Sequence, residues 1–193
     1  MRFSSNLFVL LLLTVACGAA SAQANEATGV QQIRLQTFVM ASYVKPDFGG
    51  GVKNGGGTVG ADVIFGTPVQ HVNVALELRA VGSGGRVTNQ YAYSGGARIG
   101  YDAGRFTPYV DLLMGYGKII FDSPSPSYYV SDNSKVYTYG GGVDVALDRH
   151  WAIRADLQKQ SWRINAVVPA FYPVVISAGV RYQFHFRNRY GPE

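Results

Sequence analysis

Acidic and basic side chains stand close together between residues 144 and 156, at spacings that could support chemistry. Asp144 and Asp156 form a pair of carboxylates, and Arg154 lies between them in the sequence. Two neighbouring carboxylates can serve as a general acid and a general base. Three glycines at 140–142 precede the pair and suggest a phosphate-binding loop, but the Lys-Ser/Thr pair of such a loop does not follow them.

The histidines and the cysteine give little support to a metal site or a catalytic site. His71, His150 and His185 are too far apart in the sequence to suggest a shared metal site, and the single cysteine, Cys17, lies in the leader described below. We therefore expect no catalytic, metal-binding or cofactor-binding residues and no cofactor.

The elements that carry these charges are strands, because apolar and polar residues alternate along them. Val143 and Val145 stand on the opposite parity to Asp144, and Ile153 and Leu157 stand opposite Arg154 and Asp156. A period of two residues is typical of a β-strand with two unlike faces. The same alternation predicts eight strands, at 33–43, 58–65, 72–80, 91–101, 106–116, 136–147, 151–162 and 174–186.

The connections between these strands alternate in length. Short ones lie at 66–71, 102–105 and 148–150, and long ones rich in Gly, Pro, Ser, Asn and Lys lie at 44–57, 81–90, 117–135 and about 163–173. Short turns at one end and long loops at the other predict an all-β, eight-stranded antiparallel up-and-down barrel.

The N-terminus reads as a secretory signal peptide, residues 1–22. Arg2 precedes the apolar run 7–16, and the small residues 20–22 form a cleavage site. Residues 23–193 then form one barrel domain, with strands from about 33 to 186 and a short polar tail. The formal charge of +5 comes without a Lys/Arg cluster with interleaved aromatics, which argues against nucleic-acid binding.

Alternation alone also fits a soluble ligand-binding barrel with an apolar interior, so the charges decide which face is outside. Five acids and five bases stand on the polar parity, a balance that an enclosed interior requires because an unpaired buried charge is costly. Glycines on the same parity leave room for long side chains inside a small barrel. We therefore interpret the carboxylate pair as part of an interior ion-pair network of Arg34, Asp62, Glu77, Arg79, Arg98, Asp111, Asp144, Arg154, Asp156 and Arg181.

Aromatic residues cap the apolar rows at both ends, as the two interfaces of a bilayer favour. Tyr43 and Tyr116 are examples at one end, and Phe106 and Trp151 at the other. The runs have the length of about 9–11 residues that a tilted strand needs to cross a membrane. The oily face is therefore predicted to contact lipid, and the strands to be transmembrane.

With these features the chain resembles the small eight-stranded outer-membrane β-barrels of Gram-negative bacteria, of the OmpA transmembrane-domain and OmpX type. The segment "YQFHF" at 182–186 resembles the C-terminal aromatic signal of that family, with Tyr182, Phe184 and Phe186 as its signal residues. The resemblance implies an outer-membrane location, contact with outer-membrane lipids, and recognition by the outer-membrane assembly machinery. Basic residues of the expected loops are candidates for contact with lipopolysaccharide phosphates, the alternative being that these charges are only solvated: Lys45, Lys53, Arg86, Lys118, Lys135 and Arg163.

The predicted function is a structural or surface-interaction role with little or no conduction and no enzymatic activity. A narrow porin-like channel is the main alternative. A lipid A-modifying barrel enzyme would need a His/Ser pair near the C-terminal strands, and no serine accompanies His150 or His185 in that pattern. The loop 117–135, with its prolines and tyrosines, is the expected contact for an extracellular partner.

Overall fold

The structure is a computed structural model that describes residues 33–47, 53–67, 69–86, 88–121, 131–163 and 171–184. The expected signal peptide, Phe186 and the tail at 187–193 lie outside these residues. The described residues form eight strands: β1 (Arg34–Lys45), β2 (Asn54–Gly66), β3 (Val72–Gly84), β4 (Thr88–Tyr101), β5 (Phe106–Phe121), β6 (Ser131–Ala146), β7 (Trp151–Arg163) and β8 (Val174–Phe184).

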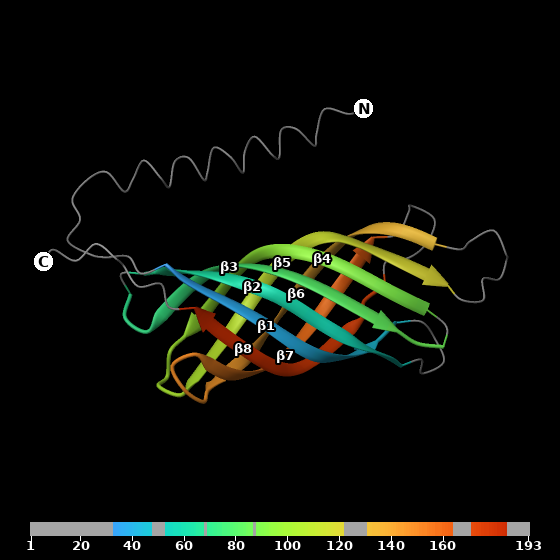
Figure 1. Cartoon of the computed structure of the whole chain (residues 1–193). Helices are drawn as coiled ribbons and strands as arrows, with labels where there is room; N and C mark the ends of the chain where they lie inside the picture. The colour runs from blue at the N-terminus through green and yellow to red at the C-terminus, as the bar shows by residue number, and fades with distance from the viewer. Residues whose placement is uncertain are drawn as a thin grey trace, which may run out of the picture. The chain divides into compact units, whose positions relative to one another are not determined.

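Each strand pairs antiparallel with the next, and β1 pairs with β8, so the sheet closes into a barrel (Figure 1). Val39 on β1, for example, lies opposite Val59 on β2 and Val180 on β8. Closure gives the backbone N–H and C=O groups partners on both sides of every strand, which a sheet in lipid requires. The prediction of an eight-stranded antiparallel up-and-down barrel is confirmed.

The barrel has two unlike ends. At the turn end, three short connections at 67–71, 102–105 and 147–150 join consecutive strands, and β1 begins and β8 ends there. Two of these turns contain a residue with positive φ, His71 at 66° and Gly104 at 70°. The other four connections lie at the opposite end, the loop end.

The strands reach further toward the loop end than the sequence predicts. β5 continues to Phe121 and β6 begins at Ser131, so ten residues of the expected loop 117–135 are strand, and 122–130 lie outside the described residues. β2 and β3 are also longer at this end, by four residues each. Glycines and polar residues there read as loop in the sequence, whereas the ladders between neighbouring strands hold them in the sheet.

The outward face is apolar through the middle of the barrel and aromatic at both edges. Leu112 and Val110 on β5 are among its most exposed apolar side chains, at 65% and 62%. Near the turn end the outward aromatic residues are Phe65, Tyr101, Phe106, Trp151 and Phe184. Near the loop end they are Tyr43, Tyr91, Tyr93, Tyr116, Tyr137 and Tyr139.

Candidate functional site in the barrel interior and at its two ends

The structure places eight of the ten predicted network residues inside the barrel with almost no solvent exposure. They come from six strands, β2 to β7, because inward positions recur at every second residue of each strand. The eight are Asp62, Glu77, Arg79, Arg98, Asp111, Asp144, Arg154 and Asp156. Arg181 is also largely buried, with 13% of its side chain exposed, and Arg34 is partly exposed at the start of β1.

Four of these residues form one cluster toward the turn end, here called the Asp144 cluster. Arg98 Nη1 lies 2.6 Å from Asp62 Oδ2, and Arg98 Nη2 lies 2.6 Å from Asp144 Oδ2. Arg154 makes the same two connections, with Nη2 2.7 Å from Asp62 Oδ2 and Nε 2.7 Å from Asp144 Oδ1. Two guanidinium groups and two carboxylates thus form a closed ring of charge-assisted hydrogen bonds across the lumen.

The other four residues form the Glu77 cluster, further toward the loop end. Arg79 lies 2.7 Å from Glu77 through Nε, and its Nη2 lies 2.9 Å from Asp156 Oδ2 and 3.7 Å from Asp111 Oδ2. Gln158 donates to Asp111 at 2.8 Å. One arginine therefore serves three carboxylates here, whereas the Asp144 cluster is balanced within itself.

Two aromatic rings lie among the arginines of these clusters. The guanidinium of Arg98 lies 3.8 Å from the ring centroid of Tyr109, and that of Arg154 lies 4.3 Å from the centroid of Phe38. Such contacts stabilise the cations because the face of an aromatic ring carries negative electrostatic potential. Gly60, opposite Phe38 on β2, leaves the space for its ring, since a Cβ there would lie 2.3 Å from Phe38 Cζ.

Phe38 was missed by the sequence reasoning, which placed charges and glycines on the inward parity. Phe38 and Met40 stand on the same parity as Gln36 and Ser42 in β1, and both are 2% exposed. Strict application of the alternation to this strand would have found them.

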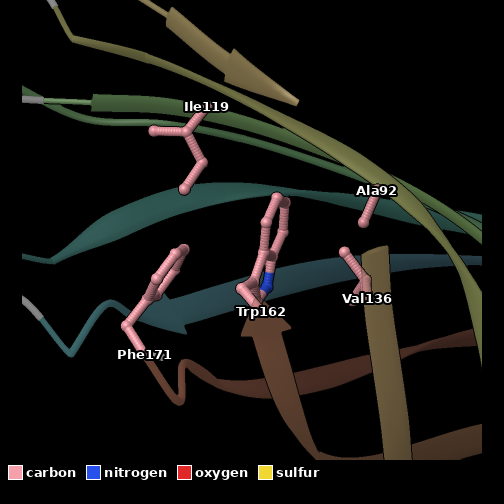
Figure 2. Close-up of a cluster of buried hydrophobic side chains, with 5 residues drawn as sticks. All are labelled: Ala92, Ile119, Val136, Trp162 and Phe171. Atoms are coloured by element: carbon pink, nitrogen blue, oxygen red, sulfur yellow. The ribbon is translucent and has the colours of Figure 1, made fainter. Parts of the chain in front are cut away.

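At the loop end the interior contains an apolar cluster beside buried polar residues such as Gln90 and Gln160, and the sequence analysis did not predict this cluster. Here Trp162 packs among Ala92, Ile119, Val136 and Phe171, as Figure 2 shows. The rings of Trp162 and Phe171 stack with centroids 5.3 Å apart. We call this group, together with the neighbouring cluster of Val44, Val81 and Val175, the apolar closure.

Backbone contacts fix the apolar closure in place. Trp162 N donates to Phe171 O at 3.0 Å, and Gln160 N donates to Pro173 O at 2.9 Å, so the segment before β8 folds against β7. Gly117 gives the indole its space, because a Cβ there would lie 2.1 Å from Trp162 Cη2. The void between the two clusters measures about 10 Å³, which is about the minimum for one water molecule.

The charges on the outward face also follow this division into two ends. The described outward side chains of the strands include no acidic residue. Their basic residues all lie near the loop end. Lys135 on β6 is register-paired with Tyr116 and Arg163, and the guanidinium of Arg163 lies 5.9 Å from the ring of Tyr137. We call this set the basic belt: Lys45, Lys118, Lys135, Lys159 and Arg163.

The remaining predicted site residues are partly described. Tyr182 and Phe184 end β8 beside Trp151, and the ring of Tyr182 lies 5.0 Å from that of Trp151 and 4.9 Å from that of Phe184. His71 and His150 lie at the turn end, and His185 is outside the described residues. The part of the chain that the structure describes contains no group of three or more His, Cys, Asp or Glu that could hold a metal ion.

Comparisons with known structures find the same fold. The crystal structure of Neisserial surface protein A (NspA) matches with a TM-score of 0.52 at 15% identity, covering 79% of this chain and 97% of that chain. Ail, the attachment invasion locus protein of Yersinia pestis, matches with a TM-score of 0.53 at 17% identity, covering 80% of this chain and 99% of that chain. No significant match is found among curated proteins.

The described residues include no helix with the length and apolar character needed to span a membrane.

The family model described as "Outer membrane protein beta-barrel domain" matches residues 8–184, which is most of the chain. The matched region includes all eight strands and the interior residues described above. The chain therefore belongs to the outer membrane protein beta-barrel domain family and is a barrel of the outer membrane.

Proposed function

We propose that this protein is a closed outer-membrane barrel with a structural or surface-interaction role and little or no conduction. In barrels of this kind the short turns face the periplasm and the longer loops face the outside. The apolar closure then lies at the extracellular end of the lumen. It is the single observation on which this proposal depends.

The closure opposes conduction because ions and small solutes need a hydrated path. Its side chains are apolar, and Trp162 and Val136 are at most 1% exposed. The void of about 10 Å³ between its two clusters, which Ser83, Gln90 and Gln160 also line, cannot hold a chain of water molecules. An apolar constriction of this kind blocks ions by excluding water.

On the turn-end side of the apolar closure, the two ion-pair clusters form a second obstacle to the passage of solutes. Their arginines connect strands on opposite sides of the lumen, as when Arg98 on β4 joins Asp62 on β2 and Asp144 on β6. An eight-stranded barrel has an interior that side chains can just fill. A narrow channel, the alternative function, would need both obstacles to move.

Conductance of the full chain in planar lipid bilayers tests the proposal. The wild-type protein should give no stable conductance steps, whereas Trp162→Ala should give brief openings because it removes the largest side chain of the closure. Leu157→Ala on the outward face of the same strand is the matched control and should behave like the wild type. Stable, ion-selective steps from the wild type would favour the channel.

We also propose that the protein is not an enzyme. A lipid-modifying site would need a histidine beside a serine, and the described histidines, His71 and His150, lie at the turn end. The interior hydroxyls of Ser42, Thr58 and Ser177 hydrogen-bond to one another at 2.6 and 2.9 Å, toward the opposite end. Incubation of the barrel with lipopolysaccharide should leave its acyl chains intact, and acyl-chain release would contradict this.

The surface role that we propose is contact with anionic lipid of the outer leaflet, lipopolysaccharide being the candidate. The basic belt places cations at the outer edge of the lipid-facing surface, and the described outward residues of the strands include no acid. Asp47, just past the end of β1, accepts a hydrogen bond from Tyr172 N at 3.3 Å. Lys and Arg near a membrane interface attract anionic headgroups. Lys118 and Lys135 lie beside Tyr91 and Tyr116 in the register, so cations and interfacial aromatic rings alternate around this part of the barrel.

Refolding into vesicles with and without lipopolysaccharide tests this role. Lipopolysaccharide should raise the thermal stability of the wild type, and the triple variant Lys118→Gln, Lys135→Gln, Lys159→Gln should lose most of that increase. Arg105→Gln with Arg149→Gln, in the turns at the other end, is the control. An equal increase in both variants would contradict a role for the basic belt.

Two further partners stay proposals. The outer-membrane assembly machinery would bind the aromatic end of β8 with Phe186. An extracellular partner would contact the segment between β5 and β6, of which 122–130 lie outside the described residues. We propose no partner of nucleic-acid type and no cofactor.

A further inference from the structure

The interior of the barrel opens into a polar cavity at the turn end. The cavity has a volume of about 410 Å³, within the range of small-molecule sites. Residues of the turns line its mouth, among them His71 and Asp102, and the ion pair between Arg98 and Asp144 lies at its inner side. Since the turns face the periplasm, the cavity is accessible from there rather than from the outside.

Positive charge is in excess around this cavity. Arg34, Arg98 and Arg181 line it together with Asp102 and Asp144. The carboxylate of Asp144 is already held by Arg98 and Arg154 at 2.6 and 2.7 Å. If Arg154 and Asp62 of the adjoining cluster are included, four arginines stand against three carboxylates.

Two of the arginines are held less firmly than Arg98 and Arg154. Arg181 Nε lies 3.8 Å from Asp144 Oδ2, beyond hydrogen-bond distance, and it has no hydrogen-bond partner among the described residues. Arg34 makes no ion pair within the described part of the chain. The acid nearest the mouth, Asp102, instead accepts hydrogen bonds from Asn73 at 3.1 Å and from Thr107 at 3.0 Å.

Neutral amides add hydrogen-bonding groups between these two arginines. Gln36 and Gln183 face each other across β1 and β8, and Gln36 Nε2 donates to Gln183 Oε1 at 2.9 Å. Arg34 lies two residues before Gln36 on β1, and Arg181 two residues before Gln183 on β8. The four side chains therefore lie on the inward parity of one strand pair, and all four line the cavity.

We propose that this turn-end cavity binds an oxyanion group, a carboxylate or a phosphate, presented from the periplasm. Arg34 and Arg181 hold it through their guanidinium groups, which match the two oxygens of either group. The cavity exceeds the size of a bare ion, so the group belongs to a larger small molecule or to a chain end. This site is separate from conduction and from the basic belt.

Titration of the full mature chain in detergent micelles tests the proposal, with the arginine Nε–Hε signals in NMR spectra as the readout. Inorganic phosphate and acetate are the two probes, each replacing chloride at constant ionic strength. We expect saturable shifts of the Arg181 signal with at least one probe. If only phosphate saturates, the cavity is selective for phosphate groups, and if only acetate saturates, it is selective for carboxylates. If both saturate, it binds oxyanions in general.

Variants then locate the site. Arg34→Gln and Arg181→Gln should each weaken binding by about tenfold or more, because each removes a charged hydrogen-bond donor. Arg181→Lys keeps the charge, loses the two-pronged geometry and should give a smaller loss. Lys135→Gln removes the same charge at the other end and should change nothing. Heat-modifiable gel migration checks that each variant is folded.

Two results overturn the proposal. One is the absence of saturable shifts with both probes in the wild type. The other is saturable binding with the same affinity in the wild type, Arg34→Gln and Arg181→Gln, which would place the anion elsewhere. Neither result bears on conductance, so the proposed function is tested independently.

Discussion

Arg154 on β7 donates a hydrogen bond from Nη2 to Oδ2 of Asp62 on β2 across the lumen, at 2.7 Å. The two residues are 92 positions apart in the sequence, and their strands are not neighbours in the barrel. Both side chains are fully buried. The contact therefore ties together two strands that β1 and β8 separate, in a place where an unpaired charge would be costly.

A double-mutant cycle measures this tie. Asp62→Asn and Arg154→Gln should each destabilise the barrel by about 3–5 kcal/mol, because each leaves a buried partner without its counter-charge. The double variant should lose about 0.5–3 kcal/mol less than the sum of the two single losses. Urea unfolding in lipid vesicles gives the three free energies.

Lys45→Gln serves as the distant partner in a control cycle with Asp62→Asn. Lys45 lies nine residues along β1 from Gln36, which is the register partner of Asp62. The two losses should add within about 0.3–0.5 kcal/mol. Additivity in both cycles would show that the Arg154–Asp62 contact is not a working ion pair.

Leu112 on β5 tests the lipid-facing surface. It lies outward, 65% exposed, between the aromatic residues Phe106 and Tyr116 of the same strand. Leu112→Arg should cost about 2–4 kcal/mol, as for a charge near the middle of the bilayer. Val145→Arg lies on the same face but opposite Phe106, at the turn end, and should cost only about 0–1 kcal/mol.

Unfolding in vesicles gives the loss of stability for both arginine variants. Leu112→Ala shows how much of the loss at Leu112 comes from removing the leucine side chain rather than from adding a charge. If arginine costs the same at Leu112 and Val145, the membrane does not cover the barrel between the two aromatic edges.

Trp162→Ala should destabilise the barrel by about 3–5 kcal/mol, because it empties the centre of the apolar closure. Tyr172→Ala is the control: it removes an aromatic ring that is 45% exposed, next to Phe171 in the sequence. That change should cost less than 1 kcal/mol, as is usual for exposed positions. Thermal unfolding of the refolded proteins measures both, and equal losses would contradict a packed closure at the loop end.

The aromatic end of β8 should be needed for assembly in cells. Tyr182→Ser and Phe184→Ser should lower the amount of folded barrel in the outer membrane, and deletion of 187–193 should not. Because the Tyr182 ring also contacts Trp151, a lower stability could give the same result. Trp151→Ser removes that contact from the other side and serves as the control.

Refolding of the purified variants separates the two explanations. If the segment is read by the assembly machinery, Tyr182→Ser and Trp151→Ser should refold equally well in detergent but differ in cells. Equal assembly of both variants in cells would argue that Tyr182 acts only through packing.

Asp148 gives the turn between β6 and β7 a pH dependence. Its Oδ1 accepts hydrogen bonds from the backbone N–H groups of Trp151 and His150, at 2.8 and 2.7 Å, and these bonds lower the pKa of the carboxyl group. A lowered pKa in the folded state means that the ionised form stabilises the turn. That contribution is present above the ordinary carboxyl pKa of about 3.9 and is lost as the pH falls through the lower folded value.

Asp148→Asn is the matched variant, because the amide oxygen can accept the same bonds but does not titrate. The difference in unfolding free energy between wild type and variant should therefore shrink as the pH falls below about 3.9. A difference that is constant from neutral to acidic pH would contradict this role of the carboxylate.

The sequence by itself determined the number of strands and the faces of each strand. Side-chain direction in a strand repeats every two residues, so the alternation around Asp144 and Arg154 shows without any tertiary information that these charges share one face. The equal numbers of acids and bases on that face indicated that it is enclosed, and the aromatic residues at the strand ends indicated a bilayer.

Only the tertiary structure decided which charges pair and where the interior changes from polar to apolar. Arg154 reaches Asp62 because the pairing of β1 with β8 closes the sheet and brings β7 within reach of β2 across the lumen, and no local pattern encodes that distance. The apolar closure was missed for the same reason. Ile119 falls in the expected loop 117–135, whereas Val136 and Trp162 stand at the ends of two predicted strands, and they form a core only because β5, β6 and β7 bring them to one level inside the barrel.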